Sequence, residues 1–315
     1  MKKGSTTQPK RHHWIPRFYL KWFATEETLG TKSPQVYIFN RISGEPLLVS
    51  TKNIAVKNYL YAPLLAGNSD DRDFTRETEL AELEGFMSQI WPKLACDFVD
   101  LTSEPFRKGM SLFLATLFLR HPYTLKRQRE SRQQIIRIIE SAPKDKTGDP
   151  QIGWIEFGSF KHRIPFDVEW WHALRDANEN DEHRVFVDMI RAQSTNIAEG
   201  LMRKRWSIIF MDEPFIVTSD NPFFVMDPDL KRDQVLGPEA KLMFPISPTR
   251  VLCLDDLDEP GNRYYKLSCE QASLYNMLTW VNTDDYMISS RPIDDVLEEI
   301  TLLEELAKRE STKNR

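Results

Sequence analysis

The stretch "RHHWIPRFYLKWFA", residues 11–24, places two histidines and a tryptophan ahead of a proline and an aromatic-rich run. Pro16 suits the first turn of a helix and favours an extended conformation for the residue before it. We therefore expect His12, His13 and Trp14 to form an extended segment that leads into a buried helix. The apolar residues of that helix share one face at helical spacing; they are Ile15, Phe18, Tyr19, Trp22 and Phe23.

The adjacent histidines His12 and His13 cannot both enter one pocket, because neighbouring residues of an extended segment point to opposite faces. A single site would use one of them, as a general base, a proton carrier or a metal ligand near neutral pH. The alternative is that one histidine bonds to the backbone while the other is solvated. The HxH and HxxxH spacings of a metal-ligand pair do not occur here.

The composition is that of an ordinary globular protein, since 41% of the 315 residues are hydrophobic and 28% are charged. No apolar run is long enough to span a membrane, and "MKKGSTTQPKR" lacks the apolar stretch of a secretory signal. We therefore expect a cytoplasmic protein with no membrane partner. The net charge of −5 does not indicate a nucleic-acid partner, which would need a local basic patch.

Several common motifs are missing from the chain. GxGxxG, GxxxxGK[ST] and GxSxG do not occur, which argues against a Rossmann or P-loop nucleotide site and against the α/β-hydrolase elbow. The cysteines Cys96, Cys253 and Cys269 are odd in number and far apart, so they form neither a disulfide framework nor a CxxC metal site. We expect all three to be small buried residues.

Hydrophobic periodicity separates helices from strands along the chain. A hairpin is predicted from two strand patterns, 35–41 and 46–50. A kink or a division of the 104–140 helix is expected at Pro122. The helical patterns cover 74–98, 104–140, 167–178, 182–203, 268–282 and 292–309. The remaining strand patterns cover 206–211, 215–218, 223–226, 241–247 and 250–255.

These elements predict an α+β fold, with a mainly helical first half and a mostly antiparallel sheet built largely from the second half. Residues 1–11 are expected to be a basic, disordered N-terminal segment, and residues 12–310 a single α+β domain. Residues 142–153 have the composition of a loop between the two halves.

A polar tip lies between two apolar runs in "FIVTSDNPFFVM", residues 215–226. Pro222 forces Asn221 to be extended, while Asp220 and Ser219 can bond to nearby backbone amides. An Asx-type turn would account for all of these residues. The functional alternative is a carboxylate and an amide held rigidly at the end of core strands, as a catalytic carboxylate or a hard-metal ligand requires.

Arg120 follows the core-like residues of "FLRHPYTLKRQRESR", residues 118–132. A guanidinium in that place could grip a carboxylate or a phosphate, and a buried arginine must be paired. The basic residues from 126 to 137 are interpreted as a solvated helix face. Asn276 lies in an apolar helical pattern, where a buried amide needs partners.

In this order, these stretches resemble a bacterial family known as domain of unknown function 4238. The likeness rests on "HHWIPRFYLKWFA", "ELAELEGFMSQIWPKL", "LFLRHPYTLKR", "RWSIIF…FIVTSDNPF", "FPISPTRVL" and "LYNMLTW", and it spans roughly residues 10–290. The family pattern implies which positions matter and no activity. It aligns through His13, Pro16, Tyr19, Leu20, Glu84, Arg120, Pro122, Asp220, Asn221, Pro222 and Asn276.

The first hypothesis is a hydrolase, either a nuclease or another phosphoester hydrolase. His13 would act as general base or metal ligand, Asp220 would orient it or hold a divalent ion, and Asn221 would position the substrate. Arg120, Asn276 and Tyr19 would bind the substrate. The cofactor stays open, with Mg²⁺ or Mn²⁺ as the candidates, because one histidine and one carboxylate are a sparse ligand set.

Two other hypotheses stay open. A non-catalytic module could bind an anionic ligand or nucleic acid through Arg120 and the basic N-terminal segment. Alternatively, the polar residues only brace one another, in which case Arg120 and Asp220 would form a buried ion pair with no adjoining cavity. The sequence does not decide the substrate or the oligomeric state.

Overall fold

The N-terminal segment is extended and then helical, as the sequence predicts. Strand β1 (Arg11–His13) pairs antiparallel with β4 (Val56–Asn58), and it leads into helix α1 (Arg17–Leu20) and the 3₁₀ turn η1 (Lys21–Phe23). The computed structural model describes residues 8–65, 70–144, 146, 148, 150, 155–157, 160–162, 167–226, 237 and 240–302.

A four-stranded sheet joins the beginning of the chain to its end, in the order β3-β2-β13-β8. The predicted hairpin of β2 (Gln35–Asn40) and β3 (Pro46–Ser50) is confirmed, and a second 3₁₀ turn, η2 (Thr51–Asn53), follows it. β2 pairs antiparallel with β13 (Tyr286–Ser289), which in turn pairs with β8 (Thr218–Ser219). The sequence analysis did not predict β13.

A five-stranded sheet follows the order β12-β7-β11-β10-β9. Its neighbours are antiparallel except for β12, which runs parallel to β7. The α+β class is therefore confirmed, with mostly antiparallel sheets built largely from the second half of the chain. The strands are β7 (Arg205–Phe210), β9 (Phe224–Val225), β10 (Leu242–Ser247), β11 (Arg250–Asp255) and β12 (Arg263–Lys266).

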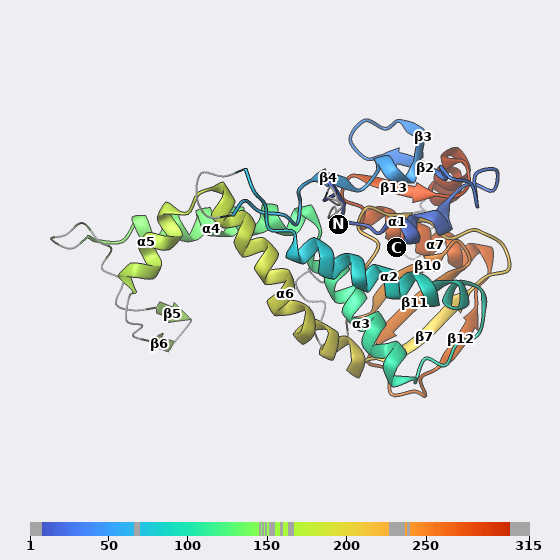
Figure 1. Cartoon of the computed structure of the whole chain (residues 1–315). Helices are drawn as coiled ribbons and strands as arrows, with labels where there is room; N and C mark the ends of the chain where they lie inside the picture. The colour runs from blue at the N-terminus through green and yellow to red at the C-terminus, as the bar shows by residue number, and fades with distance from the viewer. Residues whose placement is uncertain are drawn as a thin grey trace, which may run out of the picture.

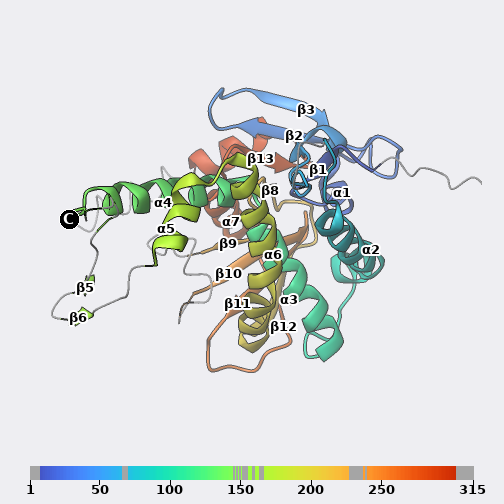
Figure 2. The ribbon, with the colours of Figure 1, turned by 60° about the vertical axis from the view of Figure 1, so that its left-hand side comes forward.

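Helices α2, α3 and α6 pack on one face of the five-stranded sheet and α7 packs on its other face. α3 and α6 pack side by side, and α4, α5 and a short hairpin lie beyond them as an arm, away from the sheets (Figures 1 and 2). The chain divides at Pro122 into α3 and α4, as predicted. The helices are α2 (Thr75–Cys96), α3 (Glu104–Leu119), α4 (Pro122–Glu140), α5 (Val168–Asp176), α6 (Glu179–Arg203) and α7 (Cys269–Val281), and the hairpin is β5 (Ile155–Phe157) with β6 (Phe160–His162).

Two predicted segments lie partly outside the described residues. The predicted helix at 292–309 is helical from 293 to 302, and its remainder is not described. Much of the predicted loop at 142–153 also falls on residues that the structure does not describe. No helix in the described ranges has both the length and the apolar character that crossing a membrane requires.

The main hydrophobic core is centred on Tyr19 of α1, which is fully buried. Its ring lies 5.3 Å from the ring of Phe244 in β10 and 5.8 Å from that of Trp91 in α2. Its hydroxyl is 2.7 Å from the hydroxyl of Thr218 in β8. One side chain of the opening segment therefore contacts α2 and both of the larger sheets, which explains why this segment organises the fold.

The prediction that all three cysteines are buried is wrong for two of them. Cys253 is buried in β11, but Cys96 and Cys269 are exposed. Cys96 is the last residue of α2 and Cys269 the first of α7. Helix ends face solvent more often than helix centres, so an apolar helical pattern alone overestimates burial there.

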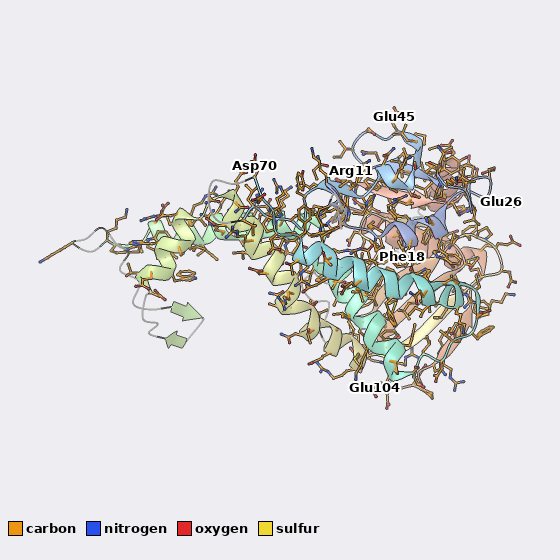
Figure 3. All side chains as sticks on the ribbon, in the orientation of Figure 1. Arg11, Phe18, Glu26, Glu45, Asp70 and Glu104 are labelled. Atoms are coloured by element: carbon orange, nitrogen blue, oxygen red, sulfur yellow. The ribbon has the colours of Figure 1, made fainter. Side chains whose placement is uncertain are left out.

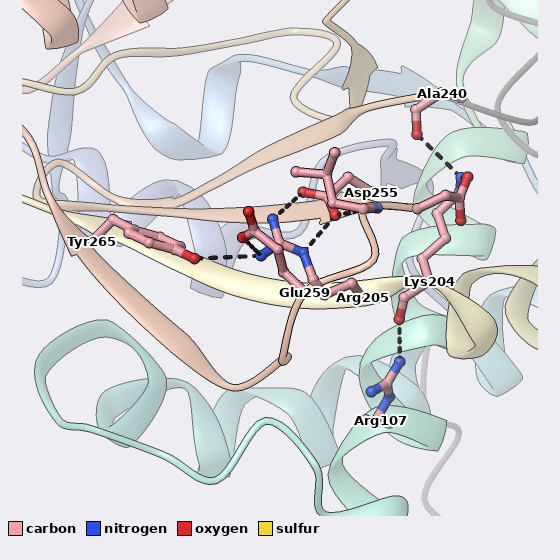
Figure 4. Close-up of polar contacts among 9 residues, drawn as sticks. Arg107, Lys204, Arg205, Ala240, Asp255, Glu259 and Tyr265 are labelled. Atoms are coloured by element: carbon pink, nitrogen blue, oxygen red, sulfur yellow. Dashed lines mark hydrogen bonds and ion pairs between the residues drawn. The ribbon is translucent and has the colours of Figure 1, made fainter.

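A network of charged side chains fastens the start of β7 (Figure 4). Nε and Nη2 of Arg205 each donate to one carboxylate oxygen of Asp255 at 2.7 Å, a bidentate pair. Nη1 of Arg205 also donates to Glu259 and to the Tyr265 hydroxyl. The hydrogen bond from Arg205 to Asp255 raises the pKa of the arginine. Next to it, Nζ of Lys204 donates to the carbonyl of Ala240 at 3.1 Å.

We expect Asp255→Ala to lower the free energy of unfolding by about 3 kcal/mol, because the guanidinium of Arg205 would lose its buried partner. The side chains of this pair are only 8% and 11% exposed. The control is Asp212→Ala, which removes the partner of Lys266 from a pair that is 60% and 67% exposed. That change should cost less than about 1 kcal/mol. Urea denaturation measures both, and equal losses would contradict the assignment.

Candidate functional site

A pocket of about 310 Å³ opens between the opening segment and the N-terminal half of α2. Its polar lining comes from β1 and α1 on one side and from α2 on the other. Figure 3 shows Phe18 beside α2 and Arg11 above the N-terminal half of this helix, and both residues line the pocket. The charged and titratable lining residues are Arg11, His13, Arg17, Tyr61, Glu77 and Glu84.

His13 faces this pocket, whereas His12 is fully buried and does not line it. The prediction that the two histidines point to opposite faces is confirmed. Nε2 of His13 is buried and has no hydrogen-bond partner. Burial lowers the pKa of His13 to about 4, although a hydrogen bond to the backbone of Lys52 opposes the shift. The ring is therefore neutral at pH 7, with a nitrogen left for a ligand or a water.

His12 holds the opening segment against α2 from the other side. Its Nε2 lies 2.9 Å from the carbonyl of Pro9, and its Nδ1 accepts a hydrogen bond from the backbone N–H of Tyr61 at 3.1 Å. The ring is therefore neutral, with its proton on Nε2 and a lone pair on Nδ1. Nδ1 also lies 3.3 Å from a carboxyl oxygen of Glu77, and the neutral ring places no positive charge beside that carboxyl.

Glu77 is the acidic group of the pocket whose pKa is most clearly displaced. Burial, together with the negative charge of Glu84, raises the pKa of Glu77 to about 7, and the charge of Arg120 opposes the shift. A carboxyl with a pKa near neutrality can both release and accept a proton at physiological pH. Such a shift in a pocket is characteristic of functional sites.

Arg120 is 99% buried behind the pocket and is held by three hydrogen bonds. Its Nη1 donates to Glu84 at 2.7 Å and its Nε to the carbonyl of Trp14 at 2.8 Å. Its own carbonyl accepts from the hydroxyl of Tyr61 at 2.9 Å. Nη2 remains buried without a partner. The predicted need for a buried partner is met by Glu84, not by Asp220 as the bracing hypothesis expected.

The side chains of Asp220 and Asn221 form hydrogen bonds with the backbone of a loop more than sixty residues further along the chain. The two carboxylate oxygens of Asp220 accept from the backbone N–H groups of Asp284 at 3.0 Å and of Asp285 at 2.7 Å. The side-chain amide of Asn221 donates to the carbonyl of Asn282 at 3.1 Å. Burial raises the pKa of Asp220 to about 7, against the effect of the Asp285 amide. Neither residue lines the pocket beside His13.

Asn276 and Tyr19 are fully buried and also lie away from this pocket. Oδ1 of Asn276 accepts from the N–H of Val217 at 3.0 Å, and its Nδ2 donates to the carbonyl of Phe215 at 2.9 Å. The amide thus joins α7 to the segment that leads into β8. The hydroxyl of Tyr19 is occupied by Thr218. Both side chains are engaged in the interior.

The structure thus divides the predicted residues into two groups. His13 lines the pocket, and Arg120 lies behind it, whereas Asp220, Asn221, Asn276 and Tyr19 bond to the interior. Trp14 connects the groups, because its carbonyl accepts from Arg120 and its Nε1 donates to the carbonyl of Asp220 at 3.2 Å.

Sequence reasoning missed four charged or titratable residues of the pocket, Arg11, Arg17, Tyr61 and Glu77. The spacing of residues in the sequence could have identified two of them, Arg11 and Glu77. Arg11 and His13 alternate in an extended segment and so share a face. Glu77 precedes Glu84 by seven residues, two helical turns, which places both carboxyls on the same face of α2.

The described residues do not supply a set of ligands for the divalent metal ion that the sequence suggested. Within the described ranges, no group of three or more His, Cys, Asp and Glu side chains could hold a metal ion. Both carboxylate oxygens of Asp220 already accept hydrogen bonds from backbone N–H groups.

Comparison with known proteins places the chain in one family. A family model described as "Protein of unknown function (DUF4238)" matches residues 11–292. The match covers every residue that lines the pocket beside His13. No curated protein and no solved structure matches the chain. The function must therefore be argued from the residues themselves.

We expect Asn276→Leu to lower the free energy of unfolding by about 3 kcal/mol. The change keeps the branched shape of the side chain but leaves two buried backbone groups, the N–H of Val217 and the carbonyl of Phe215, without partners. Leu274→Ala on the same helix is the control, because Leu274 is 45% exposed, and it should cost less than about 1 kcal/mol. If Asn276→Leu unfolds at the same urea concentration as this control, the amide is not a structural bridge.

Proposed function

The chain belongs to this family of unknown function, and we propose that its pocket beside His13 hydrolyses a phosphoester. Glu77 exchanges the proton, and Arg11 and Arg17 bind the anionic group. One observation carries the proposal: a carboxyl whose pKa is about 7 lies in an open pocket that a neutral histidine and two arginines also line.

The cations of the pocket support an anionic substrate. Arg11 is held in place, because its Nη2 donates to the carbonyl of Lys52 at 2.9 Å and to Asn53 at 3.2 Å. Arg17 adds a second positive charge from the first residue of α1. Glu84 does not cancel these charges, since Arg120 already neutralises it. Guanidinium groups match the oxygen geometry of phosphate esters.

Proton transfer is assigned to Glu77. Water attacks phosphorus and forms the new P–O bond, while the bond to the leaving oxygen breaks. Protonated Glu77 gives its proton to that leaving oxygen, so an alcohol departs instead of an alkoxide. The proton that the water loses then restores the acid form of Glu77, and the products are the alcohol and the phosphate.

His13 is assigned an orienting role in this scheme. A pKa of about 4 makes its ring too weak a base to remove a proton from water at neutral pH. The ring donates to the Lys52 backbone, and the unpartnered Nε2 then accepts a hydrogen bond from the attacking water. This orienting role replaces the role of general base that the sequence suggested for His13.

The second candidate is binding without turnover. The same arginines, together with the buried and unpartnered Nη2 of Arg120, favour an anion whether or not chemistry follows. Saturable binding with no product would support this alternative. An assay against DNA, RNA and simple phosphoesters, with and without Mg²⁺ or Mn²⁺, separates the two functions.

We also propose that the chain acts in a reducing compartment such as the cytoplasm. Cys96, Cys253 and Cys269 are all free. Disulfides persist mainly in oxidising compartments, and three unpaired thiols suit a protein that is kept reduced.

We expect Glu77→Gln to lower kcat/KM about 100-fold, because glutamine keeps the shape of the side chain but has no proton to exchange. In the wild type, the raised pKa keeps the carboxyl protonated below about pH 7 and ionised above it. Activity that needs the acid form therefore declines as the pH rises through about 7, and Glu77→Gln should remove this decline. A pH profile of kcat/KM on both proteins measures the effect.

The matched control is Glu82→Gln, an exposed position on the same helix. It should leave both the rate and the pH profile unchanged. An unchanged rate in a folded Glu77→Gln protein would dismiss Glu77 as the acid. An identical loss in Glu82→Gln would show that the effect comes only from the total charge of α2.

We expect Arg17→Gln to raise KM about fivefold and leave kcat nearly unchanged, since Arg17 is exposed and binds the anion before and during the reaction. Added salt should raise the KM of the wild type more steeply than that of the variant. Lys21→Gln removes the same charge at an exposed position four residues further along, and it should change neither value. A wild-type KM that does not depend on salt would contradict the assignment.

A further inference from the structure

A second pocket, of about 270 Å³, lies between β4, α4 and the start of α6, at the base of the helical arm. Its lining is richer in positive charge than that of the first pocket. The residues that matter are Lys57, Arg72, Arg129, Glu179, Asn180 and His183.

Three cations face this pocket from three different parts of the chain. Lys57 comes from β4, Arg72 from the segment before α2, and Arg129 from α4. Besides burial, which acts most strongly, the charges of all three lower the pKa of His183. Glu179 is the acid among the described lining residues.

The neighbouring carboxylate of Glu182 does not cancel the excess positive charge of this pocket. One of its oxygens lies 2.9 Å from Nε of Arg129, and the other lies 2.6 Å from Nη1 of Arg132. One carboxylate is thus shared by two guanidiniums, so this group of three side chains keeps a net charge of +1. Because the acidic side chains of the protein do not balance all of this positive charge, the pocket favours the binding of an anion from solution.

The walls of the pocket are held in place before any ligand binds. The guanidinium of Arg72 lies 4.0 Å above the ring of Tyr59, and its Nη1 donates to the carbonyl of Ala62 at 2.7 Å. Asn180 bonds to both the N–H and the carbonyl of Leu64, at 2.8 and 3.1 Å. Groups that are already ordered bind without a further loss of conformational entropy.

We propose that this second pocket binds a phosphate group, either inorganic phosphate or the phosphate of a monoester. Lys57, Arg72 and Arg129 supply the positive charges, and charged donors bond strongly to phosphate oxygens. The site is separate from the first pocket. In the β1–β4 pair, Lys57 lies opposite His12 and Val56 opposite His13, and paired residues share a face. The proposal does not depend on the proposed hydrolysis.

The test is a titration of the full chain with inorganic phosphate and, separately, with methyl phosphate at constant ionic strength. The six histidines of the chain allow the ring resonances of His183 and His13 to be followed separately by NMR. The His183 resonance should shift saturably with at least one probe, and the probe that binds more tightly identifies the source of the phosphate. Lys57→Gln should weaken that binding about fivefold.

Two controls make the outcome specific. Lys126→Gln removes an exposed charge from α4, outside the pocket, and should leave the titration of His183 unchanged. Arg17→Gln alters the first pocket and should leave it unchanged as well. A His183 resonance that does not respond to either probe, or equal weakening by Lys57→Gln and Lys126→Gln, would overturn the site. A response of His13 without one of His183 would also overturn it while supporting the first pocket.

Discussion

The buried guanidinium of Arg120 is the constraint on which the rest of the structure depends. An ion with only 1% of its surface exposed must be paired, and the pairing brings distant segments together. Its side chain bonds to Trp14 in the opening segment and to Glu84 in α2. Trp14 then bonds to the carbonyl of Asp220, so the arginine at the end of α3 fixes both the pocket and the turn after β8.

The same constraint sets the electrostatics of the pocket. Glu84 is paired with Arg120; burial raises the pKa of Glu77, the charge of Glu84 adds to the shift and that of Arg120 opposes it. Two carboxyls on one helix face thus play different parts: Glu84 is the structural partner of Arg120, while Glu77 has a pKa of about 7. A raised carboxyl pKa beside a second acid is characteristic of acid–base chemistry.

The sequence predicted the fold class because the periodic elements are long, and it misjudged the site because partners in space leave no trace in local spacing. The aromatic run of 15–23 and the division at Pro122 followed from local physics. Strand β13 did not, since only its pairing with β2 reveals it. Asp220 had both a structural and a functional interpretation, and the backbone amides of Asp284 and Asp285, more than sixty residues away, decide how its carboxylate is used.

The paired histidines link the two pockets. Because side chains alternate along β1, His13 faces the first pocket and His12 faces the other way. Burial lowers the pKa of His12, and so do the charges of His183 and Arg72, which line the second pocket. A neutral His12 places no positive charge beside Glu77, whose carboxyl oxygen lies 3.3 Å from its Nδ1. A protonated His12 would instead stabilise the carboxylate and lower the pKa of Glu77. The positive charge of the second pocket therefore helps to keep the acid form of Glu77, which the proposed chemistry in the first pocket requires.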